Sequence, residues 1–254
     1  MILPDPFLIL IAAFGVFVIA FMKGAFGGGL AIIGIPVLSL VMDPITAGAL
    51  LAPLFVLMDV VALYYWRPKT WSKIDLLLLL PSLAFGTALG FLLMTVADRS
   101  AVAVLIALIT LTFTILWFRG GGQVVEQPRS KVKAILAGTA SGITSMMAHS
   151  GGPPIAMYLL PLGLPKAVYA GTTSSFFAAG NLMKVLPWLA LAQPTTHLWG
   201  LMLLCLPFIP LGVWAGFQLH ERLDQKQLYR ICYGLLAVTA LKLLWDGLKG
   251  YGVV

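Results

Sequence analysis

Long apolar runs separated by short polar connections recur along the whole chain, and this pattern constrains the fold more than any other feature. The run at 76–97 exceeds the ~20 residues with which an α-helix crosses the ~30 Å hydrocarbon core of a bilayer. Of the 254 residues, 60% are hydrophobic and only 10% are charged. Because a spanning segment must bond all its backbone polar groups internally, the sequence predicts an all-α, polytopic membrane protein.

Two of the apolar segments are too short to cross the membrane. At 1.5 Å per residue, 30–42 reaches about 20 Å and 154–163 about 15 Å. Each follows a glycine-containing break, "GAFGGG" at 24–29 and "HSGGPP" at 149–154, which we name the first tip and the second tip. We predict that each short segment forms a half-spanning hairpin with the segment before it. The other segments lie at 7–22, 45–66, 74–97, 100–118, 132–148, 167–191, 197–219 and 228–247.

An internal repeat relates the two halves of the chain. The stretches "PSLAFGTALG", beginning at Pro81, and "PFIPLGVWAG", beginning at Pro207, share a proline and two glycines at identical spacing. Upstream, "DPITAGA" resembles "LPKAVYAGT" with a small insertion. The sequence therefore predicts two repeats of about five segments each. The first repeat covers 1–118, a cytoplasmic linker covers 119–131, and the second repeat covers 132–254.

Positive charges in the connections predict the orientation of the repeats. Lysines and arginines concentrate in three connections, which we expect on the cytoplasmic side: 67–73, 119–133 and 222–230. The uncharged connection at 192–196 is then external, so that 45–66 runs inward while 167–191 runs outward. The two repeats are thus predicted to be inverted. Inverted repeats with interrupted helices are typical of secondary transporters, whose sites lie near the midplane, and we expect the two tips to meet there.

The glycines of the tips are candidates for anion binding. A helix that begins after such a break presents free N–H groups and a partial positive charge, and glycine lets an oxyanion approach the backbone closely. The alternative is that these glycines serve tight turns or close helix packing. The expected backbone donors are Gly27, Gly28, Gly29, Gly151 and Gly152.

Two ionisable residues lie within apolar runs, where charge is costly and usually functional. Lys184 is interpreted as a counter-charge for the substrate, with snorkelling to the outer interface as the alternative. Asp59 is our candidate for coupling, as a proton carrier or as a partner of Lys184, and a structural hydrogen bond is its alternative role. Lys23 and Lys242 lie nearer to segment ends, so we expect both to snorkel.

Side-chain donors complete the candidate site. Thr173 and Asn181 share a helical face with Lys184 and can line a pathway, although Thr in membrane helices often bonds its own backbone. His149 and Ser150 lie at the second tip. His149 can donate to an anion or titrate near neutral pH, or it can pin the tip through a hydrogen bond.

Other functional classes receive little support. The excess of 16 Lys and Arg over 9 Asp and Glu lies in short connections, where it orients the protein, so we expect no nucleic-acid partner. No metalloprotease motif, nucleophile elbow or phosphate-binding loop is present in the sequence. Ser141 and His149 would lie about 12 Å apart along one helix, too far for a catalytic hydrogen bond. We therefore expect no enzyme, no cofactor and no metal site.

The glycine-rich first tip followed by "IGIPVL", the second tip within "GGPPIAMYLLPLGLP", and the stretch from "AGTTS" to Asn181 resemble the sulfite exporter TauE/SafE family. The resemblance covers about residues 8 to 247. It implies movement of small sulfur-containing anions, such as sulfite, sulfoacetate and other organosulfonates, across the bacterial inner membrane. Where members often carry an asparagine in the first half that matches Asn181, this chain has Asp59, and the added charge suggests proton coupling.

These observations together predict a multi-pass secondary transporter that moves a small anion by alternating access. The alternatives are an anion channel or a transporter of small carboxylates. The expected partners are the anion and the lipid bilayer, and a homodimer is left open.

Overall fold

The structure is a computed structural model, and it describes residues 5–28, 38, 41–42, 44–93, 98–120 and 126–252. These residues form helices and connections, without a β-strand among them. Six helical stretches of the described residues are long and apolar enough to cross a membrane. The prediction of an all-α, polytopic membrane protein is therefore confirmed.

The helices follow the predicted segments closely. They are α1 (Pro6–Phe26), α3 (Pro44–Tyr65), η2 (Pro68–Thr70), α4 (Lys73–Leu93), α5 (Arg99–Arg119), α6 (Lys131–Ala148), α7 (Gly152–Leu159), η3 (Leu160–Leu162), α8 (Lys166–Ala192), α9 (Thr196–Cys205), α10 (Phe208–Arg222) and α11 (Gln225–Gly250). The segment predicted at 197–219 is divided into α9 and α10 by a turn at Leu206 and Pro207, whereas α4 continues through the equivalent Pro81. The short segment at 30–42 lies almost entirely outside the described residues.

Side-chain caps explain where several helices begin. The carboxylate of Asp98 accepts a hydrogen bond from the N–H of Ser100 at the start of α5. Asp224 and Gln227 form a capping box before α11, in which each side chain bonds the other's backbone N–H. Such reciprocal bonds satisfy N–H groups that the helix leaves without partners. The polar residues between the apolar runs thus set the helix boundaries.

Large apolar side chains are exposed over much of the described surface. Leu77, Leu186 and Leu10 are 74%, 72% and 65% exposed. On a water-soluble monomer such extensive apolar exposure would be unusual. The surface is that of helices packed on one side and facing lipid on the other.

The chain divides into two compact units, which do not coincide with the two predicted repeats. The first unit comprises Met1–Trp71 and Ala170–Arg222, and the second comprises Ser72–Tyr169 and Leu223–Val254. Each unit therefore takes helices from both halves of the sequence. The division into repeats describes similarity along the chain, and it stays a prediction.

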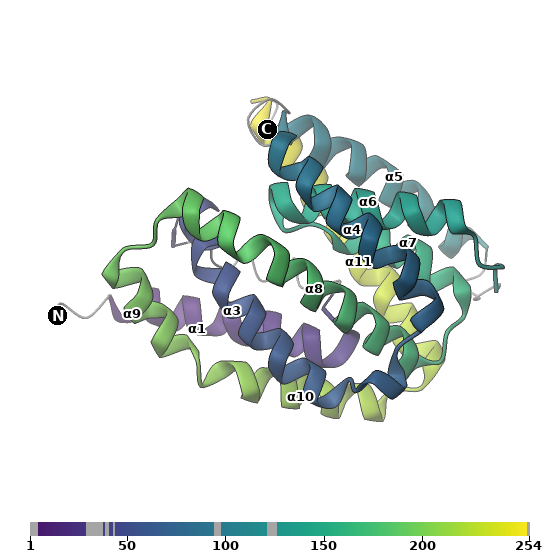
Figure 1. Cartoon of the computed structure of the whole chain (residues 1–254), viewed down its shortest axis with the longest axis horizontal. Helices are drawn as coiled ribbons and strands as arrows, with labels where there is room; N and C mark the ends of the chain where they lie inside the picture. The colour runs from purple at the N-terminus through teal and green to yellow at the C-terminus, as the bar shows by residue number, and fades with distance from the viewer. Residues whose placement is uncertain are drawn as a thin grey trace. The chain divides into compact units, whose positions relative to one another are not determined.

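In the first unit, α1 packs along α10 (Figure 1). A Cβ atom added at Gly216 would lie 2.0 Å from the carbonyl oxygen of Phe21, and one added at Gly212 would lie 2.7 Å from that of Phe17. No larger residue fits at these positions, because the two backbones are in near contact. Small residues at membrane helix interfaces permit this approach.

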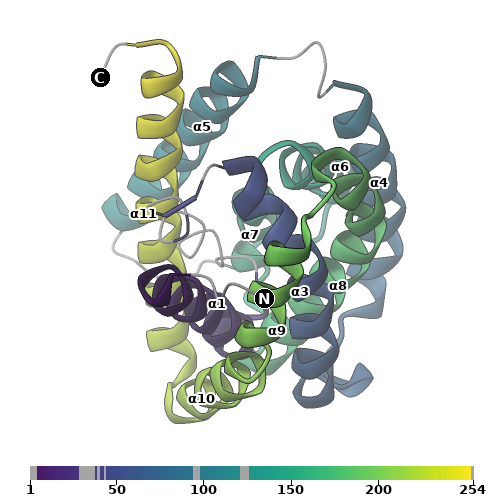
Figure 2. The ribbon, with the colours of Figure 1, turned by 90° about the vertical axis from the view of Figure 1, so that its left-hand side faces the viewer.

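The second unit repeats this arrangement with α4 and α6, and α5 packs along α11 (Figure 2). A Cβ atom at Gly86 would lie 2.1 Å from the carbonyl oxygen of Thr139, and one at Gly90 would lie 2.9 Å from that of Ile143. Gly86 and Gly90 are the sequence equivalents of Gly212 and Gly216. The repeated glycines thus make equivalent helix contacts in the two units.

Candidate functional site

Four polar side chains from three helices of the first unit meet in its interior: Lys23 of α1, Asp59 of α3, and Asn181 and Lys184 of α8. We call them the buried charge cluster. Each is at most 3% exposed. An ionised group in such surroundings is costly unless charged or hydrogen-bonding partners surround it. The cluster therefore has to satisfy its own charges.

Asp59 is the centre of the cluster. Lys23 Nζ donates to Asp59 Oδ1 in a buried ion pair. Asn181 Nδ2 donates to the other oxygen, Oδ2, at 2.5 Å. The two carboxylate oxygens of Asp59 thus each accept a hydrogen bond, and both donors come from other helices.

The amine of Lys184 shares an aromatic neighbour with that of Lys23. Lys184 Nζ lies 5.3 Å and Lys23 Nζ 5.1 Å from the centroid of the Phe55 ring, distances at which a cation interacts with an aromatic face. Two amines therefore lie near one carboxylate, that of Asp59. Among the residues that the structure describes, this cluster therefore contains more basic side chains than acidic ones.

The structure corrects the expectation for Lys23. We expected its side chain to snorkel, but it is 2% exposed and pairs with Asp59. The reason is that the last turn of α1 is buried, from Met22 to Phe26. Snorkelling of Lys184, the alternative left open by the sequence, is also wrong, because that side chain is equally buried.

The first tip lies against this cluster. At Gly28, whose φ is +97°, an added Cβ atom would lie 3.1 Å from Lys23 Cγ and 3.8 Å from Lys23 Nζ. Gly27 ends α1 with φ +77°, and its N–H donates to the carbonyl of Lys23 at 3.0 Å. A Cβ atom there would lie 2.1 Å from the carbonyl oxygen of Ala170. Gly27 therefore caps α1 and packs on α8, and Gly29 lies outside the described residues.

Residues of α6 hold the second tip, in the second unit. Ser141 Oγ donates to the carbonyl of Gly151 at 2.6 Å, and Thr144 Oγ1 donates to that of Ser150 at 3.2 Å. His149 ends α6 in the left-handed conformation, with φ 52°, and its N–H donates to the carbonyl of Ser145. The hydroxyl of Ser141 thus binds the tip.

Helix α7 begins at the second tip, with Gly151 as its N-cap and Gly152 as its first residue. Within the described residues, no side chain caps this helix end. Pro153 follows in the first turn, where its missing N–H removes no helix bond. The anion site that the sequence predicts at the start of α7 stays a prediction, and of the first three helical residues only Gly152 carries an N–H, because Pro153 and Pro154 have none.

The predicted site residues fall into both units. Gly28, Asp59, Asn181 and Lys184 lie together in the first unit, and Thr173 is buried on α8 of the same unit. His149, Ser150, Gly151 and Gly152 belong to the second unit. That the two tips meet near the midplane stays a prediction.

Comparison with known proteins agrees with these motifs. The family model described as "Sulfite exporter TauE/SafE" matches residues 11–243. The chain belongs to the sulfite exporter TauE/SafE family. No curated protein and no solved structure matches the chain. This TauE/SafE protein is therefore a multi-pass membrane transporter, and its family implies a small anionic substrate.

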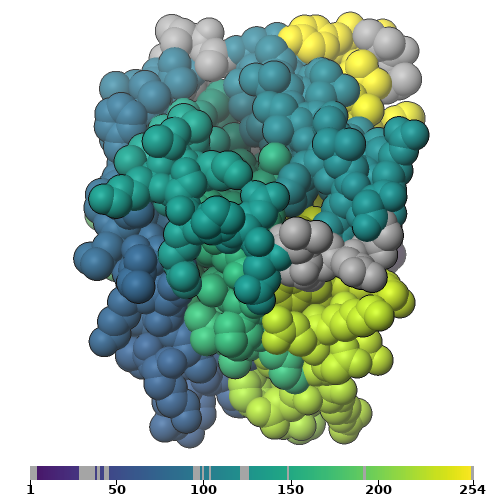
Figure 3. Space-filling view, turned by 90° about the vertical axis from the view of Figure 1, so that its right-hand side faces the viewer, coloured from purple at the N-terminus to yellow at the C-terminus, as the bar shows by residue number. Residues whose placement is uncertain are grey.

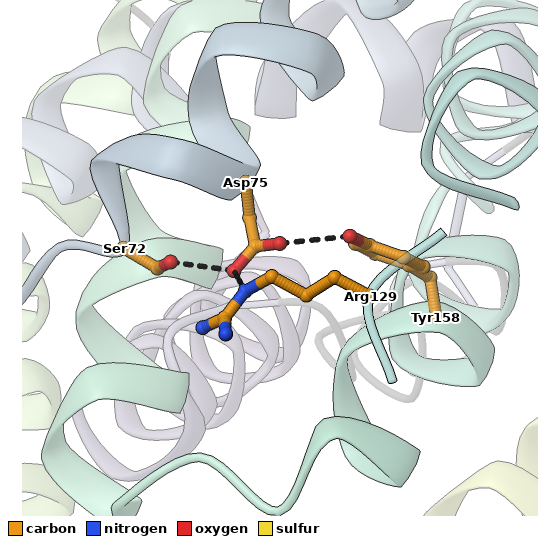
Figure 4. Close-up of polar contacts among 4 residues, drawn as sticks. All are labelled: Ser72, Asp75, Arg129 and Tyr158. Atoms are coloured by element: carbon orange, nitrogen blue, oxygen red, sulfur yellow. Dashed lines mark hydrogen bonds and ion pairs between the residues drawn. The ribbon is translucent and has the colours of Figure 1, made fainter. Parts of the chain in front are cut away.

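The TauE/SafE chain contains a second buried carboxylate, whose partners no local pattern of the sequence indicates. Asp75 of α4, 1% exposed, accepts from Tyr158 OH at 2.7 Å and from Ser72 Oγ at 2.5 Å (Figure 4). Arg129 Nε lies 3.3 Å from Asp75 Oδ2, and its side chain is 49% exposed. We call these four residues the Asp75 network. It ties the end of the linker to α4 and α7.

The described residues contain no group of three or more His, Cys, Asp and Glu side chains that could hold a metal ion. Within them, the candidate site residues offer amines, an amide, hydroxyls, an imidazole and one carboxylate.

Proposed function

We propose that this protein is a secondary transporter that moves a small sulfur-containing anion, such as sulfite, sulfoacetate or another organosulfonate, across the bacterial inner membrane by alternating access. The observation that carries the proposal is the buried charge cluster, in which two amines lie near a single carboxylate. A bound anion would balance this excess of basic groups. The TauE/SafE membership supports a sulfur-containing anion as the substrate.

The groups of the cluster suit an oxyanion with several acceptor oxygens. Lys184 Nζ and Lys23 Nζ can donate charge-assisted hydrogen bonds, which are stronger than neutral ones. The Asn181 amide carries a second N–H, and the backbone at Gly28 lies beside Lys23. The donors predicted at the second tip, which are the backbone of Gly151 and Gly152 and the side chains of His149 and Ser150, belong to the second unit and stay a separate prediction.

Asp59 gives the proposal a coupling step. Its Oδ1 accepts a hydrogen bond from Lys23, and its Oδ2 accepts one from Asn181. In this proposal the anion binds to the same two side chains. If the anion takes the amine of Lys23, the buried Asp59 carboxylate loses its cation, and neutralisation by a proton removes that cost. Anion and proton would then be bound together and carried through the same cycle. Inverted repeats would supply two interchangeable access states around the site.

Thermal unfolding of the purified protein, followed with sulfite, sulfoacetate, carboxylates and phosphate at matched ionic strength, tests the substrate class. A ligand at 100 times its dissociation constant adds roughly 2.7 kcal/mol of stability, so a specific anion raises the unfolding temperature clearly. Stabilisation by carboxylates and not by sulfonates would contradict the proposed substrate class.

Transport into proteoliposomes tests the mechanism. We expect the stabilising anion to accumulate against its gradient when an inward proton gradient is imposed. An Asp59→Asn variant should bind the anion but lose this accumulation. Downhill flux that carries a large electrical current, unaffected by Asp59→Asn, would instead indicate an anion channel.

A further inference from the structure

The second unit contains a cavity of about 600 Å³ between α5, α6 and α7. One wall is the α5 stripe of Ile106, Ile109 and Phe113, and the facing wall is the α6 stripe of Leu136, Ala137 and Ala140. The residues of each stripe recur at the spacing of one helix face. The walls are therefore continuous apolar surfaces along two helices.

The cavity opens to the outer surface of the second unit. Its wall residues Ile109 and Leu136 are 48% and 64% exposed. Figure 3 shows a face of the molecule on which atoms of α5 and α6 lie at the surface. Since α5 is one of the candidate membrane spans, an opening between apolar helix faces is accessible to lipid chains.

One end of the cavity is polar and basic. Lys133 and Gln127 line it there, and Lys133 Nζ donates to Gln127 Oε1 at 3.1 Å. Among the described residues, no carboxylate lies within ion-pair distance of Lys133. This end adjoins the linker that the positive charges assign to the cytoplasmic side. The cavity thus combines an apolar slot with an amine whose charge is not neutralised by an acidic side chain.

The nearest buried carboxylate does not oppose an anion at this end. Tyr158 lines the cavity, and its hydroxyl donates to Asp75. Asp75 is further compensated by Arg129, so the acidic group is already paired. A negatively charged group beside Lys133 would therefore meet a basic and hydrogen-bonding surface.

We propose that this cavity is a binding site for an anionic phospholipid of the cytoplasmic leaflet, with an acyl chain between the α5 and α6 stripes and the phosphate headgroup at Lys133. Basic residues just inside the membrane attract anionic headgroups, and an apolar slot between helices takes the attached chain. The site is separate from the buried charge cluster, which lies in the other unit. The inference therefore goes beyond the proposed transport function and does not depend on it.

Native mass spectrometry of the full-length protein tests this inference. The protein in detergent is offered equal amounts of phosphatidylglycerol and phosphatidylcholine with identical chains, and retained lipids are counted. We expect one preferentially retained phosphatidylglycerol. A lysine near an anionic surface contributes about 1 kcal/mol, so Lys133→Gln should lower the preference for phosphatidylglycerol about fivefold.

Two further variants separate the cavity from general surface charge. Lys131→Gln removes an exposed lysine two residues away that does not line the cavity, and it should leave the preference unchanged. Leu136→Trp fills the slot from its exposed wall, where folding is not threatened, and it should abolish retention of the tight lipid. The inference is overturned if the wild-type protein shows no preference, if both lysine variants lower it equally, or if Leu136→Trp leaves retention intact.

Discussion

Asp59 and Asp75 are both buried carboxylates in a membrane protein, yet their surroundings differ in kind. Asp59 is bonded to a buried lysine and an amide, with the second buried amine of Lys184 close by. Asp75 accepts from two hydroxyls and pairs with an arginine that is half exposed. Among the described residues, two basic groups and one acidic group meet at Asp59, whereas Asp75 accepts hydrogen bonds from its neighbours and pairs with Arg129. The first arrangement suits exchange with an anion, and the second suits a fixed structural contact.

Removal of Lys23 should produce the largest effect. Lys23→Met leaves the Asp59 carboxylate buried without its cation, and breaking a buried ion pair in this way costs about 3–5 kcal/mol. We expect a large fall in the unfolding temperature, measured in detergent. The control is Lys23→Met combined with Asp59→Asn, which removes both charges and should recover most of the stability. If the double variant is no more stable than the single one, the ion pair is not what stabilises this region.

Removal of Lys184 should affect binding more than folding. Lys184→Ala leaves the pair of Lys23 and Asp59 in place, but it takes away the second amine that we assign to the anion. We expect the anion affinity to fall at least tenfold, about 1.4 kcal/mol, in a ligand-dependent unfolding assay. Lys242→Ala is the matched control, because Lys242 pairs with Asp246 at an exposed position. If both lysine variants lost anion affinity equally, Lys184 would not be a residue of the anion site.

Mutation of the Asp75 network should lower stability without changing anion affinity, the reverse of what we expect for Lys184. Tyr158→Phe removes one hydrogen bond to the carboxylate, which should lower the free energy of unfolding by about 1 kcal/mol. Because we assign this network to structure, the anion affinity of the variant should equal that of the wild-type protein. A change in affinity larger than the change in stability would show that the two carboxylates are functionally linked.

A third carboxylate, exposed at the start of α5, should give the smallest effect. Tyr251 OH donates to Asp98 Oδ2 at 2.6 Å, and this bond, followed by the backbone N–H of Ser100, holds the pKa of Asp98 below its usual value. A lowered pKa in the folded state contributes stability above the unfolded value of about 3.9, and this contribution is lost as the pH falls through the folded value. The difference in unfolding temperature between wild type and Tyr251→Phe should therefore be small at neutral pH and vanish in acid. A difference that grows in acid would contradict this assignment.

Much of the fold could be predicted from local patterns. The helix boundaries agree with the apolar segments to within a few residues, because hydrophobic run length and capping residues act locally. Pro207 is an exception: one helix was predicted over 197–219, but a turn at this proline divides α9 from α10, whereas α4 continues through the equivalent Pro81. The glycines repeated after Pro81 and Pro207 indicated a similarity that reappears as equivalent helix contacts.

The candidate site could be predicted only in part. Asp59, Asn181 and Lys184 were identified because polar groups within apolar runs need partners, and the structure brings these three together. Lys23 was missed as a site residue because its position near the end of a run is typical of snorkelling lysines. The signal that could have identified it is the glycine-rich first tip beside it, which marks a buried turn.

The order of residues along the chain was sufficient to establish a helical membrane protein, the positions of its breaks and its membership of the TauE/SafE family, because these depend on hydrophobicity, backbone chemistry and short motifs. It did not reveal that α1 packs on α10, that Lys23 is the cation paired with Asp59, or that α5, α6 and α7 enclose a cavity. Those features join residues far apart in sequence, and they depend on how helix surfaces fit together. The periodicity of apolar residues predicts which face of a helix is buried. Which other helix packs against that face depends on the shapes of both helix surfaces.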